Sequence, residues 1–175
     1  RATADLFEKD ANWGMAIATY EKGKTFWKEA SYLYAEELAL LFDKNGNSEK
    51  ATESLLDFYV SKPEKREDIK ATFLRMMNKP EKLAELQKKV LTRSDKQPEV
   101  EAYPDLMSWL YIQQNDYEKA FDQISILDKR LQEGGRRMLG FARVAFRELQ
   151  FKASLKAYDA VIAMGSEREY YMNAR

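Results

Sequence analysis

Apolar residues recur three and four positions apart along most of the chain, and short groups of turn-forming residues interrupt them. Leu33, Leu38 and Phe42, for example, follow helical spacing before the turn-forming segment 45–47. The pattern predicts helices over residues 25–43, 48–61, 67–78, 81–93, 103–114, 117–132, 136–149 and 151–164, and the start of another from residue 167. We therefore expect an all-α protein built from helix pairs.

Capping and helix-breaking residues delimit these helices. Ser48 is expected as an N-cap, and Pro80 suits the first turn of the helix that it opens. Gly134 and Gly135 are expected to stop one helix, and Gly165 to end another. The predicted pairs are thus separated by short turns.

A short motif returns at a nearly fixed interval. Residues 117–120 read Tyr-Glu-Lys-Ala, and a related tetrad stands at residues 48–51 and again at 151–154. Ala120 lies 34 residues before Ser154 and 34 residues after Leu86. A period of about 34 residues made of helix pairs indicates a stacked repeat array, in which each unit buries its apolar face against its neighbours.

Two units match one repeat pattern at seven positions each. These positions are Met107, Ser108, Tyr111, Tyr117, Ala120, Ile124 and Leu127 in residues 101–134, and Phe141, Ala142, Ala145, Phe151, Ser154, Tyr158 and Val161 in residues 135–168. The array resembles tetratricopeptide repeats. Residues 32–66 match as a further repeat and 67–100 as a degenerate one, while 1–31 and 169–175 resemble partial repeats. The resemblance implies one domain, a right-handed superhelical α-solenoid of antiparallel helix pairs, and we expect a bacterial protein.

The resembled family lines a concave groove with the first helix of each unit, and a peptide or partner protein usually binds there. Mapped onto this sequence, the expected partner-binding residues are Arg75, Lys79, Trp109, Ile112, Gln113, Arg136, Leu139, Arg143, Phe146 and Arg147. The same mapping places Glu36, Leu40, Asp43, Lys44, Ala71, Asn78 and Asp105 on the groove. Aromatic residues among arginines suit an acidic, partly apolar peptide. The open alternative for the arginines is solvation, or pairing with Asp105, Glu133 and Glu148.

Composition narrows the functional classes. Hydrophobic residues make up 45% and charged residues 33%, which suits amphipathic helices, and the 29 basic residues equal the 29 acidic ones, so net charge gives no argument for nucleic acid. The chain has no His and no Cys, which removes the commonest general base, the usual metal ligands and the thiol nucleophile. We expect no enzyme, no cofactor and no metal.

The sequence leaves several points open. No apolar run approaches the length of a membrane span, and no signal peptide is visible. The chain begins at Arg1 without an initiator Met, so we expect a fragment or processed form, and the absence of Cys fits the cytoplasm and the periplasm equally. The favoured hypothesis is a non-catalytic scaffold for protein–protein interaction. The alternative is a structural spacer or self-assembly module of a longer repeat protein, associating through apolar ends such as Phe7 with Trp13 and Tyr170 with Tyr171.

Overall fold

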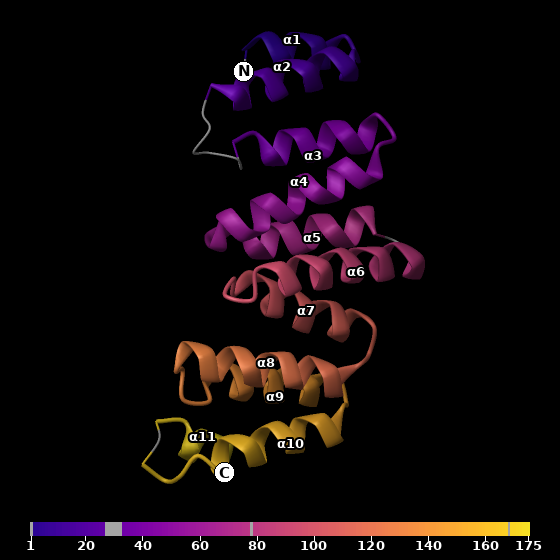
Figure 1. Ribbon diagram of the computed structural model, residues 1–175. Coiled ribbons are helices and arrows are strands. Elements are labelled where there is room, and N and C mark those ends of the chain that lie inside the picture. The colour runs from indigo at the N-terminus through magenta and orange to yellow at the C-terminus, as the bar shows by residue number, and fades with distance from the viewer. Residues whose placement is uncertain (1, 27–32, 78, 168) are drawn as a thin grey trace. The chain divides into compact units, whose positions relative to one another are not determined.

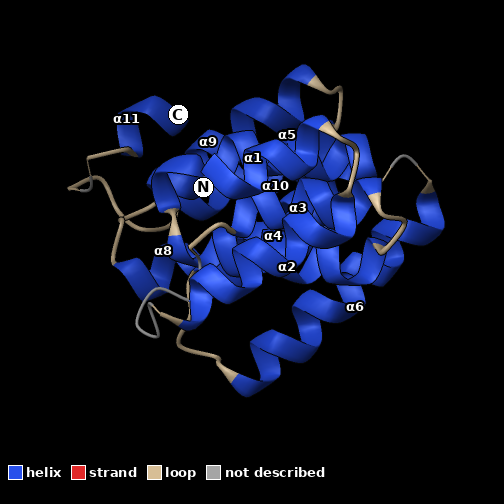
Figure 2. Ribbon diagram, turned by 90° about the horizontal axis from the view of Figure 1, so that it is seen from above, coloured by secondary structure: helices blue, strands red, loops and turns tan. Residues whose placement is uncertain are grey.

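The computed structural model describes residues 2–26, 33–77, 79–167 and 169–175, and every regular element in these ranges is helical (Figure 2). The all-α class predicted from the sequence is confirmed. In chain order the elements are α1 (Ala2–Lys9), α2 (Trp13–Thr25), α3 (Ala35–Lys44), α4 (Ser48–Ser61), the 3-10 turn η1 (Pro63–Lys65), α5 (Arg66–Met76), α6 (Pro80–Lys96), α7 (Ala102–Gln113), α8 (Tyr117–Leu131), α9 (Arg136–Arg147), α10 (Phe151–Ile162) and α11 (Tyr171–Ala174).

One predicted helix begins in the wrong place. The pattern predicted a helix from residue 25, but α2 ends at Thr25 and α3 begins at Ala35. Tyr34 precedes α3 in the left-handed conformation, with φ of 61°, and its ring centroid lies 5.0 Å from that of Tyr20 on α2. A left-handed tyrosine cannot lie inside a right-handed helix, so α3 starts after it. The predicted repeat boundary at residue 32 lies outside the described residues.

The chain forms two compact units, Arg1–Leu86 and Gln87–Arg175, and the boundary between them falls inside α6. In the first unit, each of the helices α1 to α4 packs against the one that follows it. In the second unit, α7 packs against α8, α8 against α9 and α10, α9 against α10, and α10 against α11 (Figure 1). Each unit is thus built from helical hairpins that pack in chain order.

Within the described ranges, four hairpins share one turn geometry, in which a single residue closes the first helix and opens the second. Its N–H donates to the carbonyl five residues earlier at 2.8–2.9 Å, and its own carbonyl accepts the amide four residues later at 3.0–3.1 Å. The residues in this position are Asn12, Asn47, Asp116 and Gln150. The first bond is that of the Schellman motif at a helix C-terminus. The N-cap of α4 is therefore Asn47 rather than the predicted Ser48.

The shared turns follow the sequence period. The four positions lie 35, 69 and 34 residues apart, so the middle interval equals two periods. Each hairpin also has a pair of small buried residues twelve positions apart, namely Ala4 with Ala16, Ala39 with Ala51, Ser108 with Ala120, and Ala142 with Ser154. In the last pair the Ser154 hydroxyl donates to the Ala142 carbonyl at 2.8 Å. Small side chains at both positions let the paired helices approach closely.

Leu149→Gly is expected to stabilise the second unit by about 1 kcal/mol, because Leu149 holds the left-handed position of its turn with φ of 59°. Its side chain is exposed, so the substitution removes little packing. Urea unfolding of the wild type and the variant measures the difference. Gly46 occupies the equivalent position before α4 with φ of 76°, and Gly46→Leu is the matched reverse change. Equal stability of all three proteins would contradict the strain argument.

Candidate functional site

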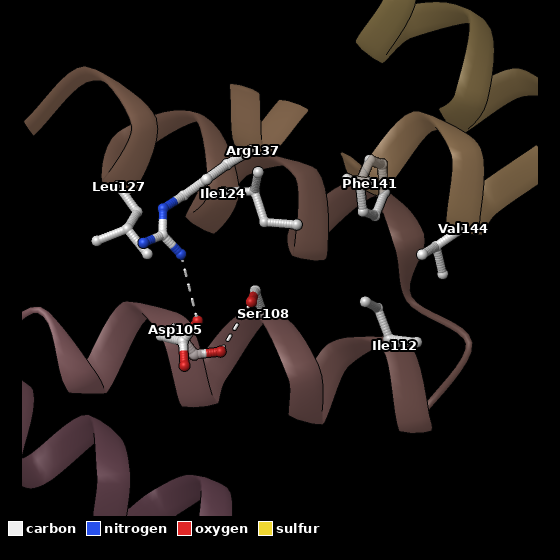
Figure 3. A pocket seen from close by; sticks show the side chains of 8 residues that line it. All are labelled: Asp105, Ser108, Ile112, Ile124, Leu127, Arg137, Phe141 and Val144. Atoms are coloured by element: carbon white, nitrogen blue, oxygen red, sulfur yellow. Dashed lines mark hydrogen bonds and ion pairs between the residues drawn. The ribbon is translucent and has the colours of Figure 1, made fainter. Parts of the chain in front are cut away.

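An open pocket of about 220 Å³ lies between α7 and α9, with α8 contributing to its wall (Figure 3). Asp105, Ser108 and Ile112 line it from α7, and Arg137, Phe141 and Val144 line it from α9. Ile124 and Leu127 of α8 complete the lining. The pocket therefore belongs entirely to the second unit.

Helical spacing brings these side chains together. On α7 and on α9, the lining residues are separated by three and four positions, which places each set on one face of its helix. Phe141 packs against α8, since its ring centroid lies 5.9 Å from that of Phe121 and 6.1 Å from that of Tyr117. The buried apolar core of this unit thus forms the base on which the pocket is built.

One end of the pocket is closed by charge. Arg137 Nη1 lies 3.6 Å from Asp105 Oδ1 across the pocket, and Arg137 Nε lies 2.7 Å from Glu133 Oε2. Their side chains are 30%, 17% and 15% exposed, so this ion pair is shielded from solvent more than an ordinary surface pair. Among the described atoms, Arg137 Nε and Glu133 Oε2 lack hydrogen-bond geometry despite their short distance, so the contact is ionic.

A buried carboxylate orients α9. Asp128 of α8 accepts hydrogen bonds from the Gly135 N–H at 2.8 Å and from the Arg137 N–H at 2.9 Å. Gly135 is the N-cap of α9 and has no side chain that could satisfy these amides. Asp128 therefore supplies the cap from the neighbouring helix, and its negative charge lies at the positive end of the α9 dipole.

The predicted groove residues of the second unit have different surroundings. Ile112 lines the pocket, and Trp109 is half-buried one helical turn from both Asp105 and Ile112. Leu139 is buried in the core cluster, so its side chain is not available to a partner. Phe146 is exposed and packs edge-on against Phe151, with 5.7 Å between ring centroids.

The predicted cationic residues also differ from one another. Arg136 lies 2.6 Å from Glu133, whose carboxylate raises the Arg136 pKa, so pairing with Glu133 holds for this arginine. Arg143, Arg147 and Gln113 are exposed, and within the described ranges no ion pair involves Arg143 or Arg147. Arg75 and Lys79 are exposed in the first unit, where Arg75 donates to the Thr72 hydroxyl at 3.0 Å. Asn78 lies outside the described residues.

The sequence did not single out Arg137, Phe141 or Val144 as groove residues. Phe141 carries the helical-packing pattern and was assigned to the core, and it does pack there while also lining the pocket. The run of two arginines at 136 and 137 held the missing signal, because only the second shares a face with Phe141 and Val144.

A comparison with protein-family models and with curated proteins finds no match. In the part of the chain that the structure describes, no group of three or more acidic side chains could hold a metal ion. The same part contains no helix with the length and apolarity needed to cross a bilayer. The site is therefore characterised by its shape and charge alone.

Proposed function

We propose that this protein is a non-catalytic scaffold of the tetratricopeptide-repeat type, which binds a peptide or a partner protein on the first helices of its hairpins. The repeated turn, the small-residue pairs and the period of about 34 residues support a right-handed α-solenoid as the underlying architecture. In such an array the first helices of successive units lie side by side, and α7 and α9 are two of them.

The open pocket between α7 and α9 carries this proposal. Its walls are mainly apolar, and α9 contains four arginines and no acidic residue. Trp109 lies on α7 one helical turn from the lining residues Asp105 and Ile112, and Arg143 and Arg147 remain without ion pairs in the described residues. Apolar contact at the centre with cations around it is the arrangement of a protein-binding surface for an acidic, partly apolar partner.

Trp109→Ala combined with Arg143→Glu is expected to abolish partner binding while leaving the helical content unchanged. Both side chains are at least partly exposed, and neither belongs to the buried core. The measurement is affinity capture from the native organism with the wild-type full chain and the double variant, followed by mass spectrometry. A protein that is captured by the wild type and not by the double variant would support partner binding in the groove.

The control for this experiment is Met172→Ala combined with Lys129→Glu, which makes the same kinds of change at exposed positions outside the pocket. It is expected to bind the partner as the wild type does. Circular dichroism checks that all three proteins are folded. Equal capture by the wild type and the Trp109, Arg143 double variant would show that the partner binds at another surface.

The second candidate is a structural spacer or self-assembly module, and one observation favours it. Phe146, Leu149, Phe151 and Leu155, around the turn between α9 and α10, are 57%, 71%, 57% and 61% exposed. Four neighbouring apolar side chains form a patch that suits association with another protein surface. If light scattering shows a mass that rises with protein concentration, and Phe151→Ser abolishes this rise, self-assembly is supported. A monomer mass at every concentration would contradict self-assembly and favour the scaffold function.

A further inference from the structure

We infer, on the basis of the proposed scaffold function, that the α7–α9 pocket is an anchor pocket for one bulky apolar side chain of the partner. The partner segment would carry an acidic residue close to that anchor. Leucine, methionine and phenylalanine are the side chains that fit this description.

The size of the pocket selects a single side chain. Cavities of about 150 Å³ accept benzene, and sites for drug-sized molecules and cofactors occupy roughly 300 to 1,000 Å³. At about 220 Å³ the α7–α9 pocket falls between these limits. It has room for one leucine, methionine or phenylalanine side chain but not for a cofactor.

The lining selects an apolar group. Ile112, Ile124, Leu127, Phe141 and Val144 supply most of the wall. The polar end already holds Arg137 between the carboxylates of Asp105 and Glu133, so a carboxylate of the ligand would meet two negative charges there. An uncharged, apolar side chain is therefore the best occupant.

The C-terminal end of α9 indicates where the acidic residue of the partner would bind. Arg147 lies one helical turn beyond Val144, on the side of the pocket away from Arg137, and Arg143 precedes Val144. The nearest acidic residue in sequence is Glu148; burial raises the pKa of Tyr117 and the Glu148 charge raises it further. Since Arg143 and Arg147 have no ion pair in the described ranges, they are available to a carboxylate of the partner.

The test uses an array of nine-residue peptides in a Gly/Ser background. One central position carries Leu, Met, Phe, Ala or Glu, and one flanking position carries Glu or Lys at each spacing up to four residues. We expect Leu, Met and Phe to bind roughly ten to a hundred times more tightly than Ala, and a flanking Glu to be preferred to Lys. Binding without a preference for an apolar centre would overturn the inference.

Protein variants connect the preference to the pocket. Val144→Phe and, independently, Ile112→Phe fill the pocket, and each is expected to lower the affinity for the selected peptides at least about tenfold. Ile126→Phe makes a similar change at an exposed position of α8 and is expected to have no effect. Arg147→Glu is expected to reverse the preference for Glu over Lys while keeping the preference for an apolar centre. Lys129→Glu is its control.

The outcomes separate this inference from the proposed function. If no peptide binds, or if peptides bind equally to the filled variants, the anchor pocket is wrong. The scaffold function would still stand if the natural partner were lost only by the Trp109→Ala, Arg143→Glu double variant. If the peptides were displaced by a second copy of this chain, the pocket would be a self-association surface, which also overturns the inference.

Discussion

Asp128→Ala is expected to destabilise the protein by about 3 to 4 kcal/mol, because it leaves one buried and one partly buried amide without an acceptor and removes a charge from the α9 N-terminus. Asp128 is 1% exposed, so bulk solvent does not reach the carboxylate in the folded protein. The expected fall in melting temperature is roughly 6 to 16 °C. Thermal and urea unfolding followed by circular dichroism measure both quantities.

The matched control is Asp122→Ala, on the same helix. Asp122 is exposed and lies 3.5 Å from the Lys156 ammonium, a surface ion pair worth about 0.5 kcal/mol or less. The two variants remove the same chemical group and differ in burial and in hydrogen bonding. A loss of stability by Asp128→Ala no larger than that of Asp122→Ala would show that α9 does not depend on its borrowed cap.

Gly135→Ala is expected to destabilise the protein by about 2 to 3 kcal/mol, for two reasons that act together. Gly135 has a φ of 100°, which a residue with a Cβ rarely adopts. An added Cβ would also lie 3.2 Å from Met164 Sδ and 3.3 Å from both methyl carbons of Val161. Val161 is fully buried, so this contact cannot be relieved cheaply.

Gly140→Ala is expected to change the stability of the protein in the opposite direction. Gly140 is exposed in the interior of α9, and a Cβ there would meet no described atom within 4 Å. Because glycine in a helix interior costs about 0.5 to 1 kcal/mol relative to alanine, this variant is expected to be more stable than the wild type. Urea unfolding of the pair decides the matter. If both glycine variants shifted stability in the same direction, the assigned conformation of Gly135 would be wrong.

Local sequence signals were sufficient to predict the helices from α3 to α10 and most of their bounds, but α1 and α2 were not predicted. The turn residues Asn45, Gly46, Asn115 and Asp116 delimit helices where the periodic pattern stops, and α4 has the predicted range. The start of α3 was missed because Tyr34 has no sequence feature that announces a left-handed conformation. Its conformation accompanies packing against Tyr20 of α2, which is a tertiary contact and not a local preference.

The candidate site was only partly predictable. Ile112 could be placed by its position in the repeat, but Leu139, predicted for the same surface, packs into the core instead. The pairing of Arg137 with Asp105 joins residues 32 positions apart in sequence, so it depends on how α9 lies against α7. The role of Asp128 could not be predicted for the same reason. An N-cap residue normally stands directly before the helix that it caps, whereas Asp128 lies on the neighbouring helix.

Because one residue ends the first helix and begins the second, the turn fixes the register of the two helices in a hairpin. One residue inserted between Asn115 and Asp116 would rotate α8 by about 100° about its axis and carry Ala120 away from Ser108. The connection from α6 to α7 differs, since Gln97 closes one helix and Glu101 opens the next. Insertions are therefore expected to be tolerated in the connection from α6 to α7 and not within a hairpin turn. The connection from α8 to α9 does not tolerate them, because Asp128 of α8 binds the amides of Gly135 and Arg137.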